Sequence, residues 1–228
     1  MAIDYTVWPT VSLVQAKVKG IGFTLASDVD TDYVQQIIDS TVAEIEQECR
    51  RTFVGVAETR YFNGSGRGEQ VVDEYIDITA VRILGYFGSV AGMSLTDWWE
   101  PQTSKHPKTR IQIYQGSQPT MTRIYIGSFP FGRSNIEVTG TWGYGASIPA
   151  NIWGAVLDYS ACILAAENMY ADGTGFKTMW KEADVMEQLI VLDPKKFLPH
   201  MKRVRTAIKQ YRKPTGRFLQ NAFKKQIV

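Results

Sequence analysis

The sequence predicts an α+β protein: about four main helices form a bundle, and an antiparallel β-rich module of six to seven strands is inserted between them. Apolar residues recur every three to four positions, the helical period, over residues 31–53, 149–170 and 198–213. Between residues 54 and 143 the period falls to two, and glycine or proline separates the short alternating runs. Because helical patterns flank this stretch, we expect one helical base interrupted by a β module.

Residues 1–53 are expected to form the N-terminal helices of the helical base. Residues 9–20 predict a short helix that ends at Gly20, and residues 31–53 predict a longer one. Three acidic residues of the longer helix, Glu44, Glu46 and Glu48, are expected to face solvent. Its apolar stripe consists of Val34, Ile38, Val42, Ile45 and Cys49.

The acidic residues at the start of the longer helix invite comparison with a calcium loop. Asp28, Asp30, Asp32 and Asp39 occupy loop positions 1, 3, 5 and 12 of an EF-hand count. Position 6, which needs glycine for a sharp turn, is Tyr33, and position 12 is not the usual glutamate. The pattern therefore favours helix capping, with acidic residues stabilised by the helix dipole, and predicts no metal site.

Residues 54–146 are expected to form the inserted β module. The residues NGSG at 63–66 predict a hairpin turn between its first two strands. The glycines at 64–68 do not predict a phosphate loop, because strands flank them and no Gly-Lys-Ser/Thr follows. Trp98 and Trp99 are adjacent in an expected strand, so their side chains face opposite sides. Since at most one of them needs to enter the core, both are possible interface aromatics.

Residues 147–213 are expected to form the C-terminal helices of the helical base. Ser147 as a cap and Pro149 near the first helical position predict a helix that runs to about residue 170. Two further helices are predicted over residues 176–192 and 198–213. Pro214 and Gly216 end the last of them, and residues 214–228 form a basic amphipathic arm.

Charge is distributed unevenly along the chain. Residues 1–193 contain 14 basic and 23 acidic residues, whereas residues 194–228 contain 11 basic residues and no acidic one. A basic tail on an acidic body predicts a partner, either nucleic acid or an acidic protein surface. The basic residues of the last helix are candidates for contacts with a partner or with DNA phosphates: Lys202, Arg203, Arg205, Lys209, Arg212 and Lys213. In the arm, an apolar stripe beside basic residues also suits docking into a partner's groove: Arg217, Phe218, Leu219, Phe223, Lys224, Lys225 and Ile227.

No catalytic pattern accompanies these features. His106 and His200 are the two histidines of the chain, and neither has an acidic partner or a second ligand at a recognisable spacing. We therefore expect no enzyme, cofactor or metal. Cys49 and Cys162 fall at expected helical core positions, which predicts free buried thiols and a reducing compartment. Neither a secretory signal nor a membrane-spanning run is apparent, so we expect no membrane partner.

Two stretches carry a resemblance to a known family. The first contains CRRTF and ETRYFNGSGR within residues 49–67, and the second is GSFPFGRSNIEVTGTWGYGASIPANIWGAVLDYSACILAAE at residues 127–167. With the order helix, helix, β insertion, helix and helical C-terminus, they resemble the head–tail connector (portal adaptor) proteins of tailed bacteriophages and gene transfer agents. The resemblance covers about residues 10–170.

The resemblance implies a structural virion protein, assembled in the host cytoplasm and located in the neck at the head–tail interface. Such adaptors form a ring of identical subunits, usually twelve, under the portal protein, and they present a docking surface to a stopper or tail protein. Genomic DNA passes through the channel without sequence readout. The C-terminal segment commonly engages the portal, which implies portal docking by the arm residues named above.

Other functions remain open at this stage. The basic helix over residues 198–213 could belong to a nucleic-acid-binding module that grips phosphates without base readout. The chain could also be another ring protein of the neck, such as a stopper or a tail terminator. Whether the basic tail meets portal or DNA is not decided by the sequence.

Overall fold

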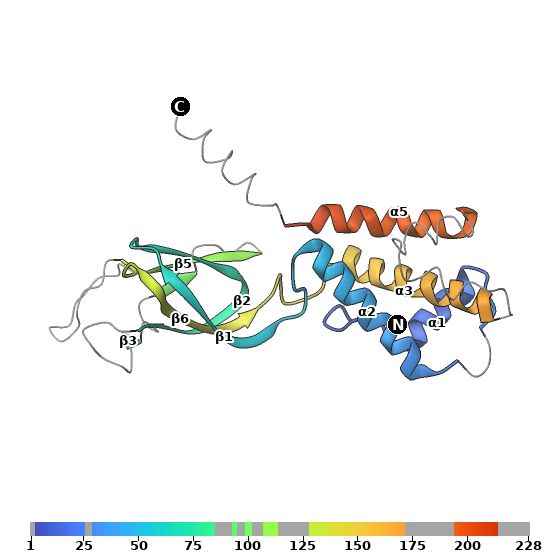
Figure 1. The fold of residues 1–228 in the computed structure, drawn as a ribbon, viewed down its shortest axis with the longest axis horizontal. Helices are drawn as coiled ribbons and strands as arrows, with labels where there is room; N and C mark the ends of the chain where they lie inside the picture. Colours follow the sequence, from blue (N-terminus) through green and yellow to red (C-terminus); the bar gives the residue numbers. More distant parts are fainter. Residues whose placement is uncertain are drawn as a thin grey trace, which may run out of the picture. The chain divides into compact units, whose positions relative to one another are not determined.

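The structure is a computed structural model of the 228-residue chain, and it describes residues 3–25, 29–84, 93–94, 99–101, 107–113, 128–171 and 194–213. The chain divides into two compact units, one made of Met1–Arg51 with Ile148–Val228 and the other of Thr52–Ser147. The first unit holds the helices and the second holds the sheet (Figure 1). The predicted α+β class is confirmed for the described residues, which form four helices and one antiparallel sheet.

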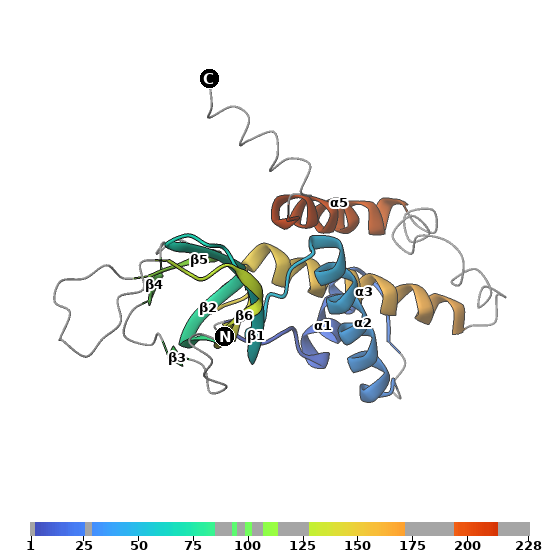
Figure 2. The same cartoon turned by 60° about the vertical axis from the view of Figure 1, so that its left-hand side comes forward.

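The helical unit is organised around one central helix. Its described helices are α1 (Val11–Gly20), α2 (Thr31–Cys49), α3 (Ala150–Ala171) and α5 (Pro194–Tyr211). All of the others pack against α3. Figures 1 and 2 show α5 on one side of α3, and α1 with α2 on the other side. The predicted helix over residues 176–192 and the arm 214–228 lie outside the described residues.

Helix α2 begins where the sequence predicts and ends earlier. The Asp30 side chain accepts a hydrogen bond from the Asp32 amide at 3.0 Å, which satisfies one of the free N–H groups of the first turn. The helix ends at Cys49 because Arg50 adopts a left-handed conformation with φ 55°. The prediction that it continues to residue 53 was therefore wrong. Of its predicted apolar stripe, all members are buried except Val42, which is half-buried.

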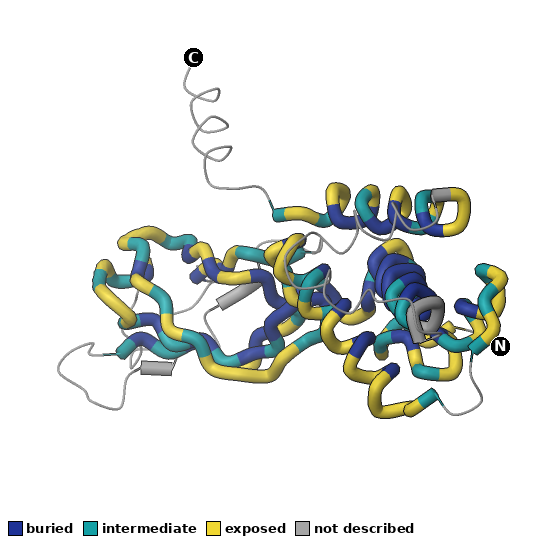
Figure 3. The backbone as a smooth tube through the Cα atoms, turned by 45° about the vertical axis from the view of Figure 1, so that its right-hand side comes forward, coloured by how far each residue is buried: buried dark blue, intermediate teal, exposed yellow. Residues whose placement is uncertain are grey.

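Helix α3 is apolar on almost every side. Figure 3 shows most of its residues from 152 to 166 as buried. A helix that is apolar all round needs partners all round, and α1, α2 and α5 provide them. Its start agrees with the sequence, since the Pro149 carbonyl accepts the Trp153 amide at 2.9 Å. Among its buried residues are Ile152, Val156, Tyr159, Cys162 and Ala166.

Helix α5 is amphipathic and longer at its start than predicted. It begins at Pro194, one turn before residue 198, since the first helical residue needs no N–H donor. Pro199 lies inside the helix and is exposed to solvent. The buried face of α5 packs on α3 and consists of Phe197, Met201, Val204, Ala207 and Ile208. The opposite face carries most of the lysines.

The β unit is one antiparallel sheet. Its long strands are β1 (Val56–Gly64), β2 (Glu69–Ile83), β5 (Lys108–Ile113) and β6 (Gly132–Trp142). The short strands β3 (Met93–Ser94) and β4 (Trp99–Pro101) pair with β2 and β5. The order is β1-β6-β2-β5-β4, with β3 beside β2. The four long strands carry the sheet, and the two short ones extend it. The predicted number of six to seven strands stays a prediction.

The predicted hairpin between the first two strands was wrong. β6 lies between β1 and β2 and pairs with both of them, so β1 and β2 are not neighbours. The turn residue Asn63 accepts the Ser134 amide at the start of β6 through its side chain, at 2.8 Å. In return, Asn135 accepts the Gly64 amide at 2.8 Å. These side-chain bonds direct the end of β1 to β6, whose alternating buried residues suit a central strand.

The sheet's core surrounds Trp142, at the end of β6. The indole N–H donates to the Glu58 carbonyl at 2.9 Å, and the ring meets Tyr75 edge-on. The Arg60 guanidinium covers the ring at 4.7 Å from its centre. The backbones of β6 and β2 also lie close together at Gly140. A Cβ added there would lie 2.4 Å from the Asp77 carbonyl oxygen, so no side chain fits at this position. The buried core also includes Val72, Ile78, Val81, Ile83, Ile111, Ile113, Phe129, Ile136 and Val138.

Candidate interaction surface

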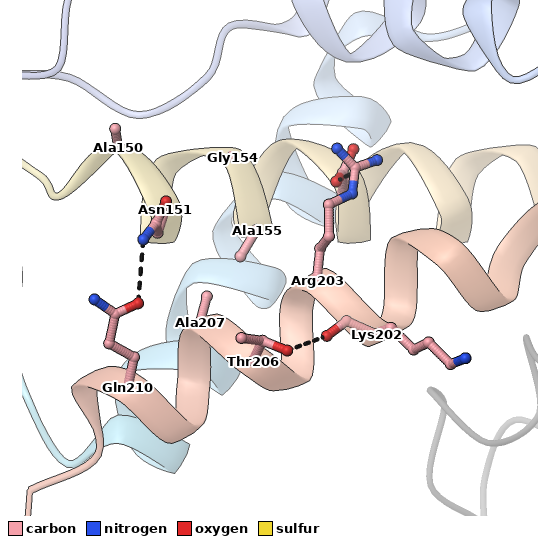
Figure 4. A pocket seen from close by; sticks show the side chains of 10 residues that line it. Ala150, Asn151, Gly154, Ala155, Lys202, Arg203, Thr206, Ala207 and Gln210 are labelled. Carbon is pink, nitrogen blue, oxygen red and sulfur yellow. Dashed lines mark hydrogen bonds and ion pairs between the residues drawn. The ribbon is translucent and has the colours of Figure 1, made fainter.

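A groove runs between α3 and α5 in the helical unit. Its volume is about 440 Å³. Small side chains line its α3 wall, and a Cβ added at Gly154 would meet nothing within 4 Å. Figure 4 shows Asn151 and Gln210 bridging one end, where the Asn151 amide donates to the Gln210 side-chain oxygen at 3.1 Å. Lys202 and Arg203 lie toward the other end, so the described groove is bounded by amides and cations.

A buried carboxylate, Asp158 of α3, forms the most strongly charged point of this surface. Its side chain is 5% exposed. Lys17 of α1 places its Nζ 2.8 Å from Oδ1, and Arg203 of α5 places Nη2 3.1 Å from Oδ2. Three helices therefore meet at one carboxylate, and the two cations compensate the cost of burying its charge. Because two cations face one carboxylate, the cluster is net positive.

His200 completes this cluster. Arg203 Nη2 lies 2.7 Å from His200 Nδ1, and the same ring nitrogen lies 3.1 Å from Asp158 Oδ1. The role of Nδ1 depends on the tautomer of the ring: without a hydrogen it accepts from Arg203, and with one it donates to Asp158. The Arg203 guanidinium thus lies beside both the Asp158 carboxylate of α3 and the His200 ring of α5.

The six predicted basic residues do not form one surface. Arg203 is held by Asp158, and Arg212 lies 3.3 Å from Glu48 of α2. Lys202 and Lys209 are exposed, seven residues apart on the outer face of α5. Arg205 and Lys213 are half-buried, and the Lys213 amide donates to the Cys49 carbonyl at 2.9 Å. The lysines of the outer face are thus available to a partner, whereas two arginines serve the fold.

The remaining predicted site residues lie outside the part of the chain whose side chains are described. Trp98 is not described, and of Trp99 only its place at the start of β4 is. The arm residues predicted to dock onto the portal are also not described: Arg217, Phe218, Leu219, Phe223, Lys224, Lys225 and Ile227. Their roles stay predictions.

Sequence reasoning missed the partners of two acidic side chains. Glu44 was expected to face solvent but is half-buried, and both of its oxygens lie 2.9 Å from the buried Tyr159 hydroxyl. The role of Asp158 was also missed. Its signal was present, since an acid within a helix that is otherwise apolar needs a compensating charge.

The cysteines and the acidic residues offer no reactive or metal-binding centre within the described residues. No group of three or more His, Cys, Asp or Glu side chains could hold a metal ion there. Burial raises the pKa of the Cys49 thiol to about 11 and that of Cys162 to about 12. Both thiols are free and buried, as expected. None of the described helices is long and apolar enough to span a bilayer.

The fold has known counterparts. A chain in the neck of an empty gene transfer agent (GTA) particle, computed with C6 symmetry, superposes with a TM-score of 0.53 at 16% identity, covering 94% of this chain and 94% of that one. The protein shares the fold of this GTA neck chain. A chain in the virion of a native GTA particle gives a TM-score of 0.50 at 16% identity, covering 93% of this chain and 95% of the other. No protein-family model matches the sequence, and no curated protein matches it.

Proposed function

We propose that this protein is a structural component of the neck of a phage-like particle, a head–tail adaptor that forms a ring under the portal. The observation that supports this proposal most strongly is the fold, which extends over 94% of the chain and matches a chain in a GTA neck over an equal share of its length. A match over 94% of each chain includes the helical base as well as the inserted sheet, so it does not depend on one common motif.

The sequence supports the same function independently. The motifs at residues 49–67 and 127–167 lie at the entry to and the exit from the inserted sheet. The neck of the GTA particle was computed with C6 symmetry, which requires repeated copies around an axis. In the proposed ring, identical subunits, usually twelve, surround a channel for genomic DNA, the C-terminal arm binds the portal protein, and the opposite side receives a stopper or tail protein. The protein thus belongs in the virion and catalyses no reaction.

The nucleic-acid-binding alternative is less well supported. A helix that grips DNA needs several free cations along one face. On α5, Arg203 lies against Asp158, and just beyond the helix Arg212 lies against Glu48. The lysines that remain on the outer face suit a weak electrostatic contact more than a dedicated DNA-binding site.

Co-sedimentation of the full-length chain with its portal ring tests the proposed function. The wild-type chain is expected to sediment with the portal. A variant with Phe218→Ala, Leu219→Ala and Phe223→Ala is expected to stay in the supernatant, because it loses the apolar stripe that would fill a portal groove. A matched control changes three polar arm residues, Gln220, Asn221 and Gln226, to alanine and is expected to bind as the wild type does.

The same proteins are then titrated against duplex DNA at increasing salt. If the wild-type chain fails to bind portal but binds DNA with a steep salt dependence, the adaptor proposal is wrong and the nucleic-acid-binding module replaces it. If both alanine variants bind portal as well as the wild type does, the arm is not the portal anchor.

A further inference from the structure

Two helices of the helical unit carry opposite charge. Helix α2 contains five acidic residues and no lysine or arginine. Helix α5 contains six lysines or arginines and no acidic residue. Glu44 of α2 and Arg203 of α5 bond to α3, whereas Asp32, Asp39, Lys202 and Lys209 are exposed, and the packing of both helices on α3 is provided by apolar side chains. The segregation of charge creates two surfaces that attract each other.

The outward face of α2 is acidic over its first half. The buried residues of α2 lie on one side of the helix, and residues 32, 36, 39 and 43 follow the helical period along the opposite side. All four are exposed, and two of them are acidic, namely Asp32 and Asp39. The Gln35 amide donates to the Asp39 carboxylate at 2.8 Å, which leaves that side chain on the surface with further acceptor capacity.

The outward face of α5 is basic and has the same spacing. Lys202, Thr206 and Lys209 lie opposite the buried stripe, and all three are exposed. The two lysines are seven residues apart, as are Asp32 and Asp39. At 1.5 Å per residue each pair spans about 10 Å, so the two pairs can meet in register.

These two faces point to different sides of one subunit. Helix α5 lies on one side of α3, and α2 lies on the other and diverges from α5 toward its N-terminus (Figures 1 and 2). The helices approach each other at their C-terminal ends, where Arg212 meets Glu48. Asp32 is at the far end of α2, so within one copy it does not reach the outward face of α5.

We propose that the acidic outward face of α2 in one copy binds the basic outward face of α5 in the next copy, with Asp32 and Asp39 opposite Lys202 and Lys209. Contacts between two different faces join copies head to tail, and they close into a ring when the rotation between copies closes. The groove beside α5, with its small α3 side chains, allows the neighbouring helix to approach closely. This inference rests on the proposed function only in that a ring requires such a contact.

Charge reversal in the full-length chain tests the pairing. One variant carries Asp32→Lys and Asp39→Lys, and the other carries Lys202→Glu and Lys209→Glu. Each has like charges on both faces and is expected to self-associate about tenfold more weakly than the wild type, because two pairs of up to about 1 kcal/mol each are lost and replaced by repulsion. Mixing the two variants restores opposite charges at every contact, so the mixture is expected to assemble as the wild type does. Sedimentation velocity measures the wild type, the two variants and their mixture.

Two controls keep the test decisive. Asp77→Lys reverses one charge at an exposed position of β2 and is expected to leave assembly unchanged. Asp32→Asn with Asp39→Asn avoids a cation at a helix N-terminus and is expected to weaken assembly about threefold, should the lysine variant prove unfolded by circular dichroism.

Three results would overturn the inference: wild-type assembly by both reversed variants, a mixture no better than either variant alone, or a wild-type chain that stays monomeric at its highest soluble concentration. Portal binding is scored separately on the same proteins. A chain that pairs as described but does not bind portal refutes the proposed function and leaves the interface standing. A chain that binds portal but does not pair as described refutes the proposed interface and leaves the proposed function standing.

Discussion

Replacing the buried carboxylate of Asp158 tests the ionic contact that joins three helices. Asp158→Asn keeps the size of the side chain and removes its charge. The Lys17 ammonium and the Arg203 guanidinium then lose their shared acceptor. Their side chains are 28% and 60% exposed, so both can turn toward water rather than remain buried and unpaired.

The expected loss of stability follows from these exposures. A hydrogen bond to a charged group contributes about 1.5–3 kcal/mol, and an exposed ion pair less than about 1 kcal/mol. The contact of Lys17 is closer to a hydrogen bond with a charged group, and that of the more exposed Arg203 is closer to an exposed ion pair. The loss is also limited because asparagine still offers one oxygen acceptor. We expect the free energy of unfolding of the helical unit to fall by about 2–3 kcal/mol.

Urea denaturation followed by circular dichroism at the helical band measures this loss. The matched control is Glu48→Gln, which removes an ion pair with Arg212 whose two side chains are about half exposed. We expect the control to change the free energy of unfolding by less than about 0.5 kcal/mol. If Asp158→Asn is no more destabilising than Glu48→Gln, the carboxylate does not hold the three helices together.

Three further predictions concern the packing of the two units. Gly140→Ala is expected to destabilise the β unit by more than about 2 kcal/mol in thermal unfolding, because its Cβ would overlap the Asp77 carbonyl. Burial raises the pKa of Glu167 above its ordinary 4.5, so the folded state binds its proton more tightly than the unfolded state does. The bound proton's contribution to the free energy of unfolding is full below pH 4.5 and is lost as the pH rises through the folded pKa. Glu167→Gln is expected to flatten the pH dependence of the free energy of unfolding over this range. Cys49 and Cys162 are expected to resist iodoacetamide at pH 8 in the folded chain and to react fully in urea, since burial raises both pKa values.

Local patterns were sufficient to predict where the helices lie. The helix predicted over residues 149–170 is found at Ala150–Ala171, because its proline start and apolar stripe are local signals. The end of α2 was harder to predict. Phe53 follows Cys49 at the helical spacing of four, and the left-handed residue that ends the helix is Arg50 rather than glycine. The usual signal for a helix end was therefore absent from the sequence.

Strand pairing could not be derived from local alternation. Alternation identifies a strand and the face it buries but not its neighbour. β6 joins β1 from about 70 residues away, and the bonds that direct this pairing come from the side chains of Asn63 and Asn135. A glycine-rich turn between two alternating runs predicted pairing with the nearer strand, β2, whereas β1 pairs with the more distant strand, β6.

The charged cluster around Asp158 in the helical unit could not be predicted from the sequence for a similar reason. The cluster joins residues of three helices: Lys17, Asp158 and Arg203. More than a hundred residues of sequence separate Lys17 from Asp158. A count of basic residues predicted a basic helix, and it could not distinguish the arginine that pairs with α3 from the lysines that remain exposed. Tertiary contacts decide which charges are left for a partner.

The junction at the end of α5 has a mechanical consequence. The Lys213 amide bonds to the Cys49 carbonyl, and the Arg51 Nε donates to the Tyr211 carbonyl at 2.6 Å. Arg51 is the last residue of the helical unit, and Thr52 is the first of the β unit. Tension applied to the arm would therefore reach the covalent link to the β unit through these two hydrogen bonds, without first unravelling α5. Force on the arm is thus passed from residues 211–213 to residues 49–51, directly before the start of the β unit.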